Sequence, residues 1–130
     1  MADKNEEVQK KILIVDDDKM NIVVLAHYLK PHYDIIIALD GLSGLNEAKE
    51  RRPDMILLDI IMPTMNGFDV YTKLKESEET KDIPVIFISE LDTNELINRS
   101  LSIGALDYVT KPFDKSLVRA KIDSYFNKDN

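Results

Sequence analysis

The sequence has 130 residues, of which 44% are hydrophobic and 32% are charged, a balance typical of one globular domain rather than of a disordered chain. It contains no cysteine, which excludes disulfides, thiol nucleophiles and thiolate-bound metals. The net charge of −7 disfavours direct binding to nucleic acid or to anionic membranes, because both of these are themselves negatively charged.

The chain shows no signal for membrane insertion or export. Its longest apolar runs, such as those at 12–15 and 55–58, fall far short of the roughly 20 residues that span a bilayer. The polar N-terminus has no apolar segment of the kind found in signal peptides. We therefore expect a cytoplasmic protein, with a flexible lead-in at 1–10 and one domain at 11–130.

From residue 11 onward, short apolar runs alternate with amphipathic stretches. The first run, KILIV at 11–15, is rich in β-branched residues, as a buried parallel strand should be. Helical spacing follows over 20–30, where Asp18 is the expected N-cap and Pro31 the expected stop. A second strand is expected at 33–39.

The same two patterns continue to the end of the chain. The next helix, at 42–52, has Leu42, Leu45 and Ala48 on one apolar face. In order after it, we expect a strand at 55–59, a helix at 68–76, a strand at 84–89, a helix at 94–102, a strand at 106–110 and a helix at 115–126.

This alternation predicts an α/β fold with a five-stranded parallel sheet and helices on both faces. The sequence alone does not determine the strand order. The doubly wound, flavodoxin-like order 2-1-3-4-5 with five helices is the one that we expect.

Polar side chains follow the predicted strands where each of them ends. Asp16 and Asp17 come after the first strand, Asp59 ends the third, Ser89 ends the fourth and Lys111 follows the fifth. Ligands of such sheets bind beyond the carboxyl ends of the strands, at the point where the strand order reverses. We therefore expect these side chains to share one edge of the sheet.

Carboxylates crowded at one edge need a compensating charge. Two of them about 4 Å apart repel by about 4 kcal/mol at an effective dielectric near 20, so either one holds a proton or a cation lies between them. A cysteine-free, oxygen-rich site suits Mg²⁺, for which Mn²⁺ is an expected substitute. A carboxylate beside magnesium and a lysine can accept a phosphoryl group, and this makes Asp59 the candidate acceptor.

Four segments of the chain carry a family resemblance, namely ILIVDD at 12–17, LLDIIMPTMNG at 57–67, PVIFIS at 84–89 and GALDYVTKPF at 104–113. In this order and spacing, they resemble the response-regulator receiver family of two-component signal transduction, to which chemotaxis receivers belong. The resemblance covers roughly residues 11–126.

The resemblance implies a role for each site residue. Asp59 would be the phosphoacceptor, Lys111 would bind the phosphoryl group, and Ser89 and Tyr108 would be the switch hydroxyl and the switch aromatic. The remaining implied roles are metal ligation by Asp17 and by the backbone carbonyl of Ile61, a water-mediated metal contact by Asp16, and a cis peptide bond before Pro112.

The family usually has a small residue directly after the switch hydroxyl, and this chain has Glu90 there. Ile61 and Leu91, two residues beyond Asp59 and Ser89, are apolar. In the family, these two positions influence how easily water reaches the phosphoryl group. We therefore expect slow self-dephosphorylation.

The resemblance implies a signalling switch rather than a conventional enzyme. Its phosphoryl donor would be a histidine kinase or a phosphotransfer protein. The phosphorylated form would act through the face made by the fourth helix, the fifth strand and the last helix. The target would be a separate protein or a covalently attached output domain.

Three other functions differ from the receiver interpretation in testable ways. An aspartate-nucleophile phosphatase needs a second acid two residues after the nucleophile, where this chain has Ile61. A flavin-binding module needs a phosphate loop after the first strand, where this chain has three aspartates. A receiver-like module that binds partners without being phosphorylated stays open, with Glu90 as the feature in its favour.

Overall fold

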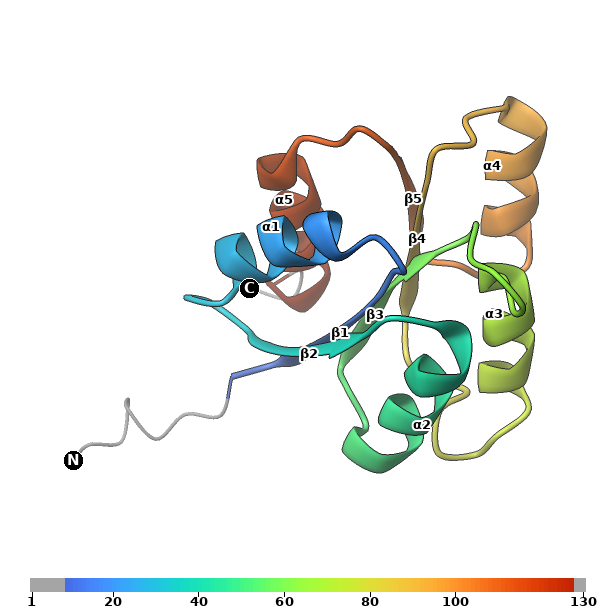
Figure 1. Cartoon of the computed structure of the whole chain (residues 1–130), viewed down its shortest axis with the longest axis horizontal. Coiled ribbons are helices and arrows are strands. Elements are labelled where there is room, and N and C mark those ends of the chain that lie inside the picture. The colour runs from blue at the N-terminus through green and yellow to red at the C-terminus, as the bar shows by residue number, and fades with distance from the viewer. Residues whose placement is uncertain (1–8, 128–130) are drawn as a thin grey trace.

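The computed structural model describes residues 9–127, and its five strands form one parallel sheet in the order β2-β1-β3-β4-β5 (Figure 1). This confirms the expected fold class and strand order. Of the lead-in expected at 1–10, residues 1–8 lie outside the described part of the chain. The strands are β1 (Lys11–Val15), β2 (Asp34–Ala38), β3 (Met55–Asp59), β4 (Val85–Ser89) and β5 (Asp107–Thr110).

Each predicted helix is also present, and every helix and strand ends within one residue of its expected boundary. Asp18 is the N-cap of the first helix, where its carboxylate accepts a hydrogen bond from the backbone N–H of Met20. The helices are α1 (Lys19–Leu29), α2 (Gly41–Arg51), α3 (Gly67–Lys75), α4 (Asn94–Ser102) and α5 (Lys115–Asn127).

The helices cover both faces of the sheet, with α1 and α5 on one face and α2, α3 and α4 on the other (Figure 1). Strand side chains alternate between the two faces, so each face has its own hydrophobic core. On the α1 and α5 face, Ile14 packs with Leu25 and Val118. On the opposite face, Leu58 packs with Leu74 and Phe87. The sheet is therefore enclosed, as the apolar strands predict.

One prediction about α2 is wrong. Leu42 does not share a buried face with Leu45 and Ala48, since its side chain is 62% exposed. The helix instead buries Gly41 and Gly44, and a Cβ atom on Gly44 would lie only 2.9 Å from Val15 Cγ2. Gly44 lets the helix backbone approach β1 closely, and Gly41 lets it approach Val70 of α3, whereas Leu42 faces the solvent.

The strand order positions the functional edge. β1 pairs with both β2 and β3, so the chain runs outward from β1 in opposite directions and leaves a crevice at the carboxyl ends of β1 and β3. None of the helices within residues 9–127 has the length and apolar character that crossing a membrane requires.

Candidate functional site

Three carboxylates meet at the carboxyl ends of β1 and β3. Asp16 and Asp17 directly follow β1, and Asp59 is the last residue of β3. One carboxylate oxygen of each lies within 4.8 Å of the corresponding oxygens of the other two. Asp16 and Asp59 are each only 4% exposed, whereas Asp17 is exposed. The structure therefore brings together the three acids expected at this edge.

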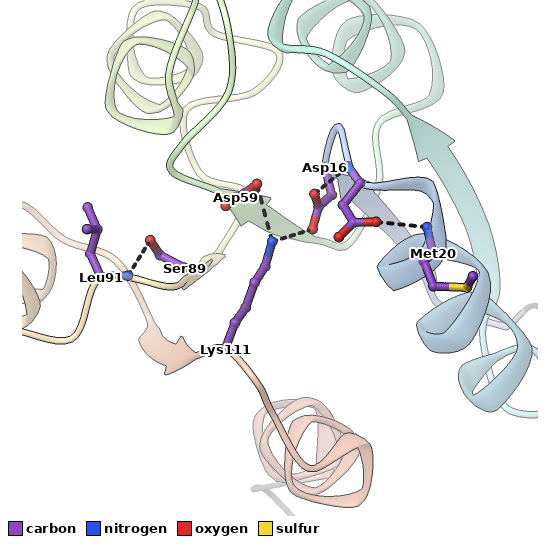
Figure 2. Close-up of polar contacts among 7 residues, drawn as sticks. Asp16, Met20, Asp59, Ser89, Leu91 and Lys111 are labelled. Carbon is purple, nitrogen blue, oxygen red and sulfur yellow. Dashed lines mark hydrogen bonds and ion pairs between the residues drawn. The ribbon is translucent and has the colours of Figure 1, made fainter.

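Lys111, which follows β5, reaches across the sheet edge to two of these acids (Figure 2). Its Nζ lies 3.0 Å from Asp16 Oδ2 and 3.4 Å from Asp59 Oδ2. The other oxygen of Asp16, Oδ1, accepts a hydrogen bond of 2.9 Å from the backbone N–H of Asp18. Both oxygens of Asp16 therefore have a protein partner.

The surroundings at this edge of the sheet disfavour the ionised form of Asp59. Burial, reinforced by the negative charge of Asp16, raises the pKa of Asp59 to about 7, although Lys111 acts in the opposite direction. For Lys111 itself, burial lowers the pKa, but the hydrogen bond to Asp16 and the charge of Asp59 outweigh it and raise the pKa overall. One ammonium group thus leaves net negative charge among three close carboxylates.

The residues present fit a divalent cation. The donors available are carboxylate oxygens within reach of one another, and hard oxygen ligands are those that Mg²⁺ prefers. Asp17 is suited to direct ligation because its carboxylate is exposed at the mouth of the crevice, whereas both oxygens of Asp16 already have partners.

The loop after β3 is held over the site by a glycine. Gly67 opens α3, and its N–H donates to the carbonyl of Ile60 at 2.8 Å. A Cβ atom at Gly67 would overlap the carbonyl oxygen of Asp59 and lie 2.8 Å from Ile60 Cα. The position of Asp59 thus depends on Gly67, a dependence that the sequence analysis missed. Ile61, in the same loop, is 50% exposed.

Ser89 and Tyr108, the expected switch residues, are joined through one backbone segment. Ser89, which ends β4, is fully buried, and its Oγ accepts a hydrogen bond of 3.1 Å from the N–H of Leu91. The hydroxyl of Tyr108 donates to the carbonyl of the same Leu91 at 2.6 Å. Figure 2 shows Ser89 and Leu91 beside the strand end that carries Asp59. This role of Leu91 could not be predicted from its side chain, because it depends on main-chain atoms.

Tyr108 points into the protein rather than onto the outer surface of β5, because its side chain belongs to the core and is 8% exposed. Leu101 on α4 is 42% exposed, and Lys121 on α5 forms an ion pair of 2.7 Å with Asp107 of β5. The face made by α4, β5 and α5 is therefore formed by residues other than Tyr108. The peptide bond between Lys111 and Pro112 is cis.

Comparisons with known proteins agree on one family. The sequence profile described as the response regulator receiver domain matches residues 12–123. The chain is 40% identical over 115 residues to the response regulator PleD of Caulobacter vibrioides, which covers 88% of this chain and 25% of that protein. It is 35% identical over 117 residues to a probable cyclic di-GMP phosphodiesterase of Vibrio cholerae, covering 90% of this chain and 26% of that protein. The chain thus spans about a quarter of the length of these relatives.

Solved structures show the same fold. The chemotaxis protein CheY4 of Vibrio cholerae superimposes with a TM-score of 0.83 at 26% identity, over 89% of this chain and 98% of that one. The receiver domain of the Francisella response regulator 1452 gives a TM-score of 0.85 at 27% identity, over 94% of this chain and all of that one (100%).

Proposed function

This chain belongs to the response-regulator receiver family of two-component systems, and we propose that it is a switch whose phosphoryl acceptor is Asp59. One observation carries the proposal. The buried carboxylate of Asp59 lies within 4.8 Å of the oxygens of Asp16 and Asp17 and 3.4 Å from the ammonium group of Lys111. Such a carboxylate is a nucleophile in a setting that neutralises a phosphoryl group.

In the proposed transfer, the donor is a phosphohistidine of a histidine kinase or of a phosphotransfer protein. A carboxylate oxygen of Asp59 attacks the phosphorus atom, so that a P–O bond forms as the P–N bond breaks. The imidazole nitrogen keeps the electron pair of the broken bond and is protonated. Lys111 lies where it can offset the charge of the phosphoryl oxygens, which is the main requirement of phosphoryl transfer.

Asp17, Asp59 and the backbone carbonyl of Ile61 would hold Mg²⁺ or Mn²⁺, with Asp16 acting through water. When bound, the cation supplies positive charge that offsets the carboxylates and the phosphoryl oxygens. Ser89 would contribute a hydrogen bond. Its Oγ accepts from the N–H of Leu91, so its own hydrogen can be donated to a phosphoryl oxygen.

The proposed signal leaves the site through Leu91. A phosphoryl group that attracts Ser89 would shift the Leu91 backbone, which Tyr108 also holds, and this would favour one of two arrangements of the segment before α4. The α4–β5–α5 face would then change its affinity for a target. That target is a separate protein or an attached output domain, and longer relatives such as PleD support the second arrangement.

We place the receiver domain at 11–130, which the family match over 12–123 supports. Its role is that of a switch and not of a conventional enzyme. Phosphatases with an aspartate nucleophile use an acid two residues further on, and this chain has the half-exposed, apolar Ile61 there.

Intact-mass measurement after incubation with acetyl phosphate and magnesium tests the proposal. We expect the gain of one phosphoryl group, its dependence on magnesium, its loss in hydroxylamine and its absence in Asp59→Asn. A failure to gain the group, from acetyl phosphate or from phosphorylated histidine kinases, would contradict it. The chain would then be a receiver-like module that binds partners without phosphorylation.

A further inference from the structure

A pocket between α3 and α4 lies apart from the phosphoryl site and from the α4–β5–α5 face. These two helices lie next to each other on one face of the sheet (Figure 1). The pocket has a volume of about 360 Å³. Its lining combines two aromatic rings, one aliphatic residue, two cations, one hydroxyl and one carboxylate, namely Phe68, Tyr71, Ile103, Lys75, Arg99, Thr72 and Glu76.

The aromatic floor of this pocket is held in place by packing and by one hydrogen bond. The rings of Phe68 and Tyr71 both pack on the buried ring of Phe87, with centroids 5.2 and 5.5 Å away. The hydroxyl of Tyr71 donates to the carbonyl of Ile103 at 3.2 Å, and this bond ties α3 to the end of α4. Gly104 makes room for it, because a Cβ atom there would lie 2.8 Å from the Tyr71 oxygen in a backbone conformation with φ of 115°.

Two cations lie over this floor. Lys75 Nζ is 4.9 Å from the centroid of Tyr71, and Arg99 Cζ is 4.8 Å from that of Phe68. Lys75 Nζ also donates a hydrogen bond of 2.7 Å to the carbonyl of Lys81. Within residues 9–127, neither cation forms an ion pair with a carboxylate, although Glu76 lines the same pocket. Both cations can therefore pair with a carboxylate of a ligand.

We propose that the α3–α4 pocket binds a peptide segment of a partner protein that carries a carboxylate next to an apolar side chain. The apolar side chain would pack on the half-buried Phe68 and the 44% exposed Ile103, and the carboxylate would bridge Lys75 and Arg99. A carboxylate can pair with both cations while they stay over the rings. The rings already pack on Phe87, so few side chains would have to become ordered on binding.

A peptide selection tests this surface. A random peptide library is displayed on phage and selected against the whole chain, and the enriched peptides are synthesised and titrated by fluorescence anisotropy. We expect enriched sequences with Asp or Glu beside a large apolar residue. Arg99→Glu should weaken their binding by about tenfold, and Lys121→Glu on the α4–β5–α5 face should leave it unchanged. Circular dichroism checks that each variant is folded.

A charge exchange separates recognition from a structural role of Arg99. A peptide in which the acidic residue is replaced by Lys should bind Arg99→Glu more tightly than it binds the wild type. Lack of enrichment, enrichment of basic peptides, or binding that is insensitive to both Arg99→Glu and Lys75→Glu would overturn the proposal. Self-association of the wild type that Arg99→Glu abolishes would also overturn it, since the occupant would then be a second copy of this chain.

Discussion

Lys111 lies closer to Asp16 than to Asp59, with Nζ–oxygen distances of 3.0 and 3.4 Å. The lysine therefore divides one positive charge between two buried carboxylates. The remaining negative charge affects Asp59, whose pKa is raised to about 7 by burial and by Asp16. Two consequences follow, one for the metal-free protein and one for the protein with a cation.

In EDTA, stability should depend on the ionisation of Asp59. The folded-state pKa lies above the ordinary 3.8, so between those values the folded protein binds more protons than the unfolded chain. The Asp59 contribution therefore lowers the free energy of unfolding as the pH rises from 3.8 to about 7, and it levels off above that pH. Asp59→Asn stays neutral, so its stability advantage over the wild type should grow up to about pH 7 and then stay constant. Urea unfolding of both proteins from about pH 5.5 to about pH 8 checks this, and a difference that is constant over the whole range would refute it.

Magnesium should stabilise the folded protein by occupying the acidic site. At a concentration about a hundredfold above its dissociation constant, we expect a gain of about 2.7 kcal/mol in the free energy of unfolding. Asp17→Asn should reduce this gain. Asp18→Asn is the matched control, because Asp18 is the N-cap of α1, asparagine caps equally well, and the same negative charge is removed. An equal loss of stabilisation in both variants would show that magnesium responds to the net negative charge of the protein and not to Asp17 in particular.

The apolar strands and the order of the polar strand ends predicted the fold and the acidic site because both depend on side-chain types. Asp16, Asp59 and Lys111 could each be placed from the strand that precedes it. Backbone relationships were not predictable in this way. Nothing in the side chain of Leu91 indicates that its N–H and carbonyl connect Ser89 with Tyr108.

The error at Leu42 has a similar origin. Helical periodicity predicts the buried face of a helix from the positions of its large apolar residues around the axis. Glycine has no apolar side chain, so a face that contains glycines is not recognised as buried. The sheet instead packs against Gly44 and helix α3 against Gly41, and the larger Leu42 is left exposed. The close approach of Gly67 to Asp59 was missed for the same reason, since both depend on the absence of a side chain.

The apolar residues at the mouth of the site should prolong the life of the phosphorylated state. Ile61 and Leu91 are 50% and 40% exposed there, and neither can orient an attacking water molecule. The double variant Ile61→Asn, Leu91→Glu should therefore lose its phosphoryl group several times faster. Decay is followed by intact mass after removal of acetyl phosphate. An apolar exchange, Ile61→Leu with Leu91→Ile, is the control, and a wild type that decays faster than the polar variant would contradict the prediction.

The exposed carboxylate of Glu90 should slow phosphorylation by small anionic donors. It follows Ser89 directly, so it adds negative charge beside the phosphoryl position. Glu90→Gln should react a few times faster with acetyl phosphate, and added salt should reduce the difference. Glu95→Gln, in the first turn of α4, removes the same charge further along the chain and serves as control. Equal acceleration in both variants would assign the effect to net charge alone.

Tyr108→Phe should lower the free energy of unfolding by about 1 kcal/mol, since it removes the hydrogen bond to the Leu91 carbonyl and keeps the buried ring. Tyr28→Phe is the control, because the Tyr28 ring contacts Lys115 and, within residues 9–127, its hydroxyl forms no comparable bond. Urea unfolding measures both effects.

Ser89 and Tyr108 are connected through the Leu91 backbone, and their side chains also interact with each other. Ser89→Ala combined with Tyr108→Phe should therefore cost less or more than the sum of the single changes. Strict additivity would show that the two hydroxyls hold Leu91 independently, and it would remove the structural basis for passing a signal from Ser89 to Tyr108.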